Sequence, residues 1–124
     1  MVLISGDGAF LSGGLSVETA FQENLPIVVV IDNNGGLDCI SQQQERLFSS
    51  GQHFATDFRD IPFHKLFEGL GGHGELVEKR IDLFPALKRA MQSGKTACVN
   101  VKSRGVISPI VAATSDKRDK ASIE

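Results

Sequence analysis

The chain is poor in the features that would place it at a membrane or on a nucleic acid. Only 6% of its 124 residues are aromatic, and all of these are phenylalanine, so no aromatic and basic stripe is available for stacking on bases. The net charge of −2 gives no basic field. No apolar run approaches the length of a membrane-spanning helix, and no basic region followed by a signal-peptide stretch opens the chain. We therefore expect no nucleic-acid partner and no membrane segment.

Cysteine is also scarce. Cys39 and Cys98 are the two cysteines of the sequence, and they lack the close spacing typical of metal ligands. A reduced, cytoplasmic location is the simpler interpretation. Cys39 could be a reactive thiol, but the sequence shows no base paired with it.

The remaining composition is that of an ordinary globular protein, with 41% hydrophobic and 23% charged residues. This length suits one domain with one core. Periodic patterning continues to about Ser103 and then fades, so we expect a domain over 1–103 and a C-terminal tail over 104–124. The charge-dense stretch 116–120 is expected to be a solvated tail or a short helix.

Two apolar runs are each followed by a glycine-rich turn that carries an oxygen-bearing side chain. Residues 1–4 precede Gly6-Asp7-Gly8, and residues 27–31 precede the turn that contains Asn34. In an open parallel sheet, turns at the carboxyl ends of the strands line the ligand crevice. Hard oxygen ligands in such turns, with glycines that let the backbone approach closely, suit a Mg²⁺–diphosphate group.

Strand-like and helix-like segments alternate along the chain, which predicts a three-layer α/β domain with a mostly parallel sheet. In the first helix, over 13–24, Leu15, Ala20 and Phe21 should face the sheet. A loop is expected over 49–60. The remaining expected elements are strands over 1–5, 27–31, 75–77 and 96–101, and helices over 40–48, from Asp60 to Gly71 and from Asp82 to Gly94.

The later helices are expected to show apolar faces and acidic caps. Asp60 and Asp82 are expected to cap their helices, and Pro62 should lie in a first turn. The inward residues are expected to be Phe63, Leu66, Phe67 and Leu70 in one helix and Leu83, Leu87 and Met91 in the other.

The two motifs, with the segment between them, resemble thiamine-diphosphate enzymes of the acetolactate synthase and benzoylformate decarboxylase branch. The resemblance runs from about Met1 to Ser103 and includes Gly6-Asp7-Gly8-Ala9-Phe10, Asn24-Leu25-Pro26 and Asn33-Asn34-Gly35-Gly36. It implies a thiamine-diphosphate-binding fold that lacks its N-terminal part. The chain would then be a C-terminal fragment, a truncated gene product or one piece of a split enzyme.

The resemblance implies a site for thiamine diphosphate and Mg²⁺. Asp7 and Asn34 would bind the metal through their side chains and Gly36 through its carbonyl. Gly6, Gly8 and Ala9 would form the backbone around the diphosphate, near a helix N-terminus that favours negative charge.

Each of these residues also has a structural interpretation. Asp7 could form a hairpin turn, although a helix-like segment follows it. Asn34 could adopt a left-handed turn, and Gly8 and Ala9 could be small only for packing.

Several residues near the motifs remain open. Asp38 departs from the glycine found in many relatives and could disfavour anionic substrates or point to solvent, and the role of Cys39 beside it is equally open. Histidine titrates near neutrality, but His64 is expected on a helix surface and His73 in a structural turn. His53, in a loop, could contact substrate.

The implied function is that of the C-terminal portion of an acetolactate synthase-like decarboxylase and carboligase acting on 2-oxoacids. The alternatives are a sister enzyme of the benzoylformate decarboxylase, benzaldehyde lyase or acyl-CoA lyase type, or a noncatalytic product that only packs against another chain. In resembling enzymes the activating glutamate comes from a pyrimidine-binding domain of a partner subunit. We therefore assign no catalytic residue, and expect an inactive isolated chain, a pyrimidine-binding partner and a homo-oligomer.

Overall fold

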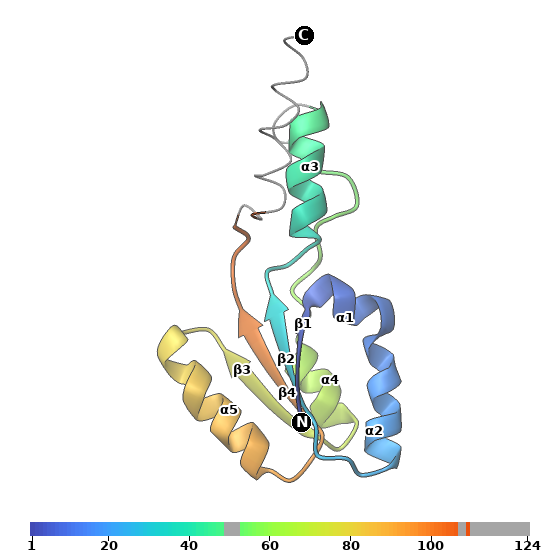
Figure 1. Cartoon of the computed structure of the whole chain (residues 1–124), viewed down its shortest axis with the longest axis vertical. Coiled ribbons are helices and arrows are strands. Elements are labelled where there is room, and N and C mark those ends of the chain that lie inside the picture. The colour runs from blue at the N-terminus through green and yellow to red at the C-terminus, as the bar shows by residue number, and fades with distance from the viewer. Residues whose placement is uncertain (49–52, 107–108, 110–124) are drawn as a thin grey trace.

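A four-stranded sheet forms the centre of the protein (Figure 1). The computed structural model describes residues 1–48, 53–106 and 109. All strand pairings are parallel, which confirms the predicted α/β class. The strands pair in the order β1-β2-β4-β3 and comprise β1 (Val2–Gly6), β2 (Val28–Asn33), β3 (His73–Val77) and β4 (Ala97–Lys102).

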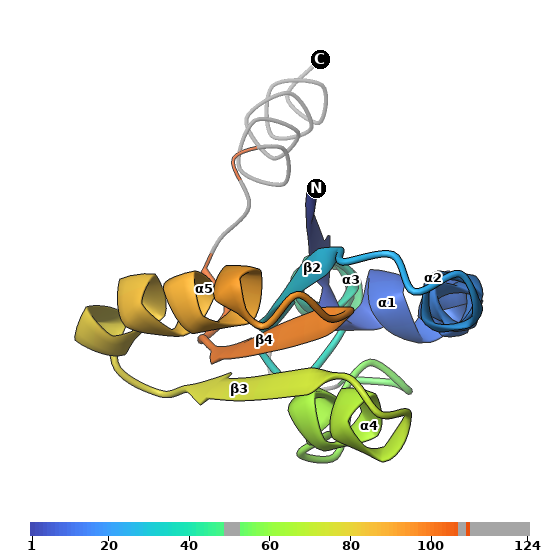
Figure 2. The ribbon, with the colours of Figure 1, turned by 90° about the horizontal axis from the view of Figure 1, so that it is seen from below.

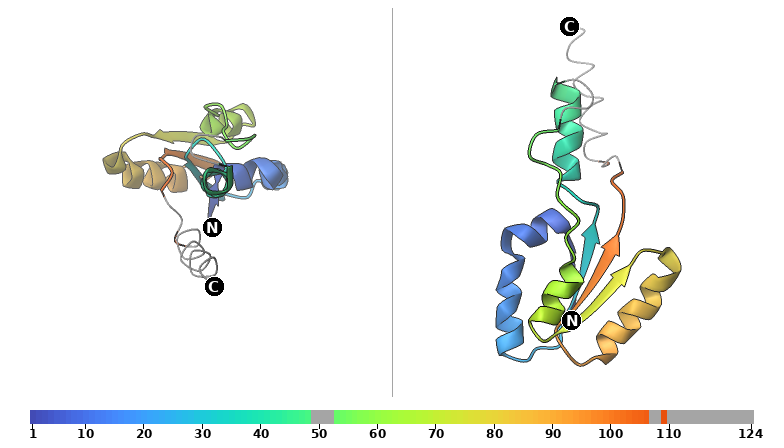
Figure 3. Two further views of the ribbon diagram at one scale, coloured as in Figure 1. Left: turned by 90° about the horizontal axis from the view of Figure 1, so that it is seen from above. Right: turned by 180° about the vertical axis from the view of Figure 1, so that it is seen from behind.

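Helices cover both faces of the sheet and give three layers (Figure 2). One face carries α1 (Asp7–Gly13), the 3₁₀ turn η1 (Gly14–Val17), α2 (Glu18–Gln22) and α4 (Phe63–Gly69). The other face carries α5 (Leu83–Gln92), which follows the 3₁₀ turn η2 (Arg80–Asp82). Figure 3 shows that α3 (Asp38–Phe48) extends beyond the ends of the strands instead of lying on the sheet.

Alternation along β2 divides its side chains between two cores. Val29 and Ile31 belong to the cluster beneath α1, α2 and α4, whereas Val28 belongs to the cluster beneath α5, with Val30 packed against it. A strand buried on both faces needs apolar residues at successive positions. The unbroken run in the sequence is therefore explained by the central place of β2.

The register places the ends of β1 and β2 side by side. Val2 pairs with Val28, and Gly6 pairs with Asp32. Since the strands are parallel, the turns that follow them emerge at the same edge of the sheet. The first two strands are therefore parallel neighbours.

The N-terminal helical region differs from the helix predicted over 13–24. It begins at Asp7, directly after β1, and is divided into α1, η1 and α2. The 3₁₀ turn changes the helical phase, so Val17 is buried while Leu15 is 68% exposed. The prediction that Leu15 faces the sheet was wrong, whereas Ala20 is buried as expected.

The helix predicted after Asp60 begins later and buries a narrower face. Asp60 does not cap it but pairs with Lys102, and α4 starts at Phe63, so Pro62 precedes the first turn. Phe63 and Phe67 are buried, as expected. Leu66 and Leu70, also predicted to lie inward, are 38% and 43% exposed because this short helix turns only one row of residues toward the sheet.

Helix α5 buries its small residues most deeply. Ala86 and Ala90 are buried, while Met91, predicted to point inward, is 63% exposed. Met91 directly follows Ala90, so the helical rotation turns it away from the row formed by Ala86 and Ala90. Asp82 stands at the N-cap position, yet its side chain makes no capping hydrogen bond, because the preceding 3₁₀ turn gives it helical angles.

The remaining expectations concern connections. Residues 53–60 contain no helix or strand, as expected of the loop, while 49–52 lie outside the described residues. Most of the expected tail over 104–124, including the charged stretch 116–120, also lies outside them. Strand β3 begins at His73, so this residue belongs to a strand and not to the predicted turn.

Candidate diphosphate and metal site

The carboxylate of Asp7 connects the turns that follow β1 and β2. Asp7 is buried, and its Oδ2 accepts hydrogen bonds from the N–H groups of Gly35 at 2.8 Å and Gly36 at 3.0 Å. Its Oδ1 accepts from the N–H of Gly8 at 2.7 Å. Asp7 is the first residue of α1, where a negative charge is favourable. The predicted metal ligand is thus held between two glycine-rich turns.

Asn33 and Asn34 are adjacent in sequence but differ in their surroundings. Asn33 is buried and donates from Nδ2 to the carbonyl of Ile61 at 3.2 Å and to Oδ1 of Asn100 at 3.0 Å. Asn34 is half-buried, and its Oδ1 accepts from the N–H of Gly36 at 3.2 Å. Asn33 is therefore a structural residue, while Asn34 presents its oxygen to the same turn as Asp7.

Backbone geometry explains the glycines of this turn. Gly35 has φ of +83°, which disfavours residues with a side chain. A Cβ on Gly36 would lie 2.5 Å from the carbonyl oxygen of Thr56, and one on Gly8 would lie 2.3 Å from Cδ2 of Leu37. Gly36 therefore lies closer to the Thr56 backbone than a larger residue would allow, whereas a Cβ on Gly8 would require the Leu37 side chain to move.

A segment that follows α3 forms the third side of the turn. Gly36 and Asp57 form an isolated antiparallel bridge. On either side of it, the N–H of Leu37 donates to Thr56 O and the N–H of Phe58 donates to Gly35 O, each at 2.7 Å. The hydrophobic periodicity of the sequence does not predict this pairing. The buried hydroxyl of Thr56 has no hydrogen-bond partner among the described residues.

The donor set fits a magnesium ion that is bound together with a diphosphate. Asp7 supplies a carboxylate and Asn34 an amide oxygen, both of which are hard ligands. No group of three or more His, Cys, Asp or Glu side chains suited to a metal occurs among the described residues. Mg²⁺ is commonly held by one or two carboxylates together with substrate phosphates, so a sparse protein shell suits an ion that arrives with its anion.

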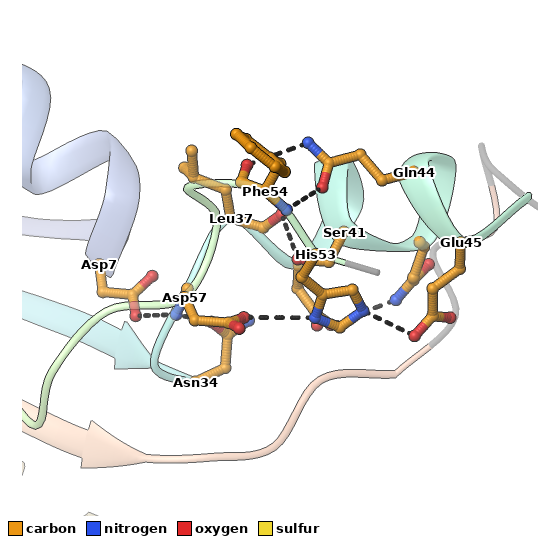
Figure 4. A network of polar contacts seen from close by, with 12 residues as sticks. Asp7, Asn34, Leu37, Ser41, Gln44, Glu45, His53, Phe54 and Asp57 are labelled. Atoms are coloured by element: carbon orange, nitrogen blue, oxygen red, sulfur yellow. Dashed lines mark hydrogen bonds and ion pairs between the residues drawn. The ribbon is translucent and has the colours of Figure 1, made fainter. Parts of the chain in front are cut away.

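A polar network links the turn region to α3 (Figure 4). Nε2 of His53 lies 2.7 Å from Oε1 of Glu45, and its Nδ1 lies 3.5 Å from Oδ1 of Asp57. The hydrogen bond with Glu45 is the main cause that raises the pKa of His53 above its usual value of 6.5. His53 is exposed, so the interaction is open to solvent.

The other ambiguous residues now have defined surroundings. Asp38 begins α3, and its Oδ2 accepts from Nε2 of Gln42 at 3.2 Å, so this half-buried carboxylate is engaged within its own helix. Cys39 is exposed. His64, predicted on the surface, is half-buried, and its Nδ1 accepts from Nδ2 of Asn100 at 3.3 Å.

Comparison with known proteins identifies the class of this site. Residues 1–101 match the family described as thiamine pyrophosphate enzyme, C-terminal TPP binding domain. The chain therefore belongs to this family, and the predicted resemblance is confirmed. Thiamine diphosphate, which is the same compound as thiamine pyrophosphate, is the cofactor that the fold binds.

The names of individual relatives describe several different activities. The chain is 39% identical over 102 residues to a probable acetolactate synthase from Mycobacterium bovis, covering 82% of this chain and 18% of that protein. It is 33% identical over 122 residues to a 2-hydroxyacyl-CoA lyase from Arabidopsis thaliana, covering 94% and 20%. A thiamine diphosphate-dependent 4-hydroxybenzoylformate decarboxylase from Rhodococcus jostii RHA1 superposes with a TM-score of 0.74 and 26% identity, covering 86% and 20%.

The chain thus spans about a fifth of the length of these relatives. In the part of the chain that the structure describes, no helix is long and apolar enough to cross a membrane.

Proposed function

We propose that this chain is the diphosphate-binding portion of an acetolactate synthase-like enzyme that decarboxylates a 2-oxoacid and joins the product to an acceptor. In this proposal residues 1–103 form the binding domain and 104–124 a tail. Asp7, Asn34 and the Gly36 carbonyl bind Mg²⁺, and Gly6, Gly8 and Ala9 surround the diphosphate. The family assignment and the 39% identity to a probable acetolactate synthase support this function.

The convergence of Asp7 and Asn34 on one amide carries the proposal. The N–H of Gly36 donates both to Oδ2 of Asp7 and to Oδ1 of Asn34. Two oxygens that share one donor lie close enough to face one small cation. The same contacts also hold the turn, because both oxygens accept from the N–H of Gly36.

The residues of the chain then have separate tasks. Bound thiamine diphosphate supplies the carbon chemistry of decarboxylation and carboligation. Asp7 offsets the charge of Mg²⁺ from the protein side, and Asn34 adds an oxygen without adding repulsion toward phosphate. Gly8 and Gly36 let the segments around the site pack closely, because side chains there would meet Leu37 and Thr56.

An acyl-CoA lyase or decarboxylase function is the second candidate. The relative named 2-hydroxyacyl-CoA lyase matches 94% of this chain, and a relative from Escherichia coli named oxalyl-CoA decarboxylase is 34% identical over 102 residues. Both candidates use the same proposed cofactor site. Assays of the assembled enzyme with pyruvate and with 2-hydroxyacyl-CoA or oxalyl-CoA would distinguish them.

Cofactor binding tests the site itself. In the assembled enzyme, Asp7→Ala and Asn34→Ala should each weaken Mg²⁺-dependent binding of thiamine diphosphate by roughly a hundredfold in Kd, since the diphosphate loses part of its counter-ion shell. Isothermal titration with and without Mg²⁺ measures this. The control is Lys65→Ala, because Lys65 is exposed on α4. Its neighbour His64 is less suitable, because it contacts Asn100. Wild-type affinity in both site variants would refute the assignment.

We further propose that the complete reaction needs a pyrimidine-binding domain or subunit that supplies the activating glutamate. The purified chain with pyruvate, thiamine diphosphate and Mg²⁺ should then show no turnover above that of the cofactor alone. Addition of the complementary domain should produce turnover. Activity of the 124-residue chain by itself would contradict this requirement.

A further inference from the structure

Helix α3 is linked indirectly to the turn that carries Asn34 and Gly36, through a segment that contacts both. We define the strap as residues Phe54–Phe58, the segment that pairs with Gly35-Gly36-Leu37. One end of the strap is fixed to the turn by the two backbone hydrogen bonds beside the Gly36–Asp57 bridge. The other end meets Gln44 on α3 (Figure 4).

Gln44 binds the strap through both halves of its amide. Its Oε1 accepts from the N–H of Phe54 at 2.7 Å, and its Nε2 donates to the carbonyl of Phe54 at 3.1 Å. Phe54 is 85% exposed, so packing of its side chain does not anchor this end of the strap. The side-chain amide of Gln44 therefore fixes the backbone in place of a strand partner.

The backbone of the strap supports this interpretation. Ala55 has φ of +57°, a left-handed conformation that residues with a Cβ seldom adopt. Such a conformation persists where the surroundings enforce it. Ala55 lies between the Gln44 contact and the bridge to Gly36, so both contacts hold it in this conformation.

We propose that Gln44 is a positioning residue for the diphosphate and metal site. It acts through the strap on the Gly35-Gly36 turn, whose N–H groups bind Asp7. This inference rests on the proposed function for its effect on the cofactor, but its effect on the turn does not. Partners of ligand-bearing groups commonly change metal affinity by ten- to a hundredfold.

The neighbouring Gln43 provides a matched control. Gln43 and Gln44 are the same residue type on consecutive positions of α3, but Gln43 is exposed. Replacement of either by alanine changes helix propensity equally. Any difference between the two variants therefore reports the contact with Phe54.

Amide hydrogen exchange of the 124-residue chain, followed by NMR, tests the link without cofactor. Gln44→Ala should raise exchange at Gly35 and Gly36 by roughly tenfold, while Gln43→Ala leaves it unchanged. Gln44→Glu retains an oxygen for Phe54 N–H but loses the donor to Phe54 O, so its effect should be intermediate. Val30 and Val99, in the central strands, serve as references for global opening.

The outcomes separate this inference from the proposed function. Equal exchange at Gly35 and Gly36 in Gln44→Ala and Gln43→Ala would overturn it, and so would an equal rise at Val30 and Val99. In the assembled enzyme, Gln44→Ala should weaken Mg²⁺–thiamine diphosphate binding by roughly tenfold relative to Gln43→Ala. If exchange rises as expected but the wild-type enzyme does not bind the cofactor, the proposed function fails while the positioning role stands.

Discussion

Asp7 contributes to the fold as well as to the proposed metal site. Its carboxylate accepts three backbone hydrogen bonds, two of them from the turn after β2. Buried amides that lose such a partner cost about 1–3 kcal/mol. The proposed metal ligand therefore also joins the ends of two strands.

We expect Asp7→Ala to destabilise the metal-free chain by about 1–3 kcal/mol, because Gly35 and Gly36 lose their shared acceptor. Asn34→Ala should cost less than about 1 kcal/mol, since the same Gly36 N–H retains Asp7. Urea unfolding without Mg²⁺ measures both. Equal stability losses would show that the turn does not depend on the carboxylate in this way.

The two cysteines should differ in reactivity. Burial raises the pKa of the Cys98 thiol to about 12, whereas Cys39 is exposed on α3. Since the thiolate is the reactive form, iodoacetamide should modify the folded chain once, at Cys39. Peptide mass spectrometry identifies the site, and Cys39→Ser should abolish the labelling. Modification of Cys98 before unfolding would contradict this expectation.

At the scale of elements, Glu75 connects β3 to α5. Its carboxylate accepts two hydrogen bonds from Arg89, at 2.9 and 2.7 Å, and lies 2.8 Å from Nε2 of His73. The bonds from Arg89 are the main cause that lowers the pKa of Glu75 below its usual value of 4.5. A lowered carboxyl pKa contributes stability that is present above pH 4.5 and is lost as the pH falls through the folded value.

We therefore expect Glu75→Gln to weaken the fold near neutral pH and to flatten the loss of stability below pH 4.5. The loss at neutral pH should be about 1 kcal/mol, because the Arg89 side chain is partly exposed to solvent. Urea unfolding over a pH series gives the profile, and the exposed neighbour Glu78→Gln is the control. Identical acid profiles for Glu75→Gln and the wild type would exclude this contribution.

The sequence predicted elements well where side chains repeat locally and failed where distant segments meet. The run over 27–31 identified β2, and the glycine-rich motifs led to Asp7 and Asn34, because these signals lie within a few residues of one another. The contacts of Thr56 with Leu37 and of Gln44 with Phe54 involve an irregular segment, which has no periodicity. Leu15 is exposed because a 3₁₀ turn changes the direction of the side chains there, and the amphipathic pattern of the sequence does not predict that turn.

At the scale of the whole molecule, an apolar surface remains beside β1. A pocket of about 500 Å³ lies between this edge strand and α5, and Val2, Phe84, Leu87 and Met91 are among its lining residues. Val2 is 48% exposed and Phe84 77% exposed. Apolar surface next to a strand at the edge of a sheet favours association.

We expect the 124-residue chain to self-associate as its concentration rises, in agreement with the predicted oligomer. Phe84→Lys, inside the pocket lining, should reduce association, whereas Ile81→Lys should not, although Ile81 is 80% exposed. Size-exclusion chromatography with light scattering at several concentrations measures the mass. A monomer at all concentrations, or an equal effect of both substitutions, would exclude this surface.

The position of β4 between β2 and β3 also has a consequence for how the chain folds. Among the described residues, the β1–β2 pair and β3 have no strand pairing with each other, and β4, which follows all three in sequence, joins them. Contacts between residues distant in sequence form slowly, because a long loop must close first. During synthesis the sheet cannot be completed until Ala97–Lys102 has left the ribosome. Until then two unfinished halves expose their apolar edges, and this interval is when the nascent chain most needs protection from aggregation.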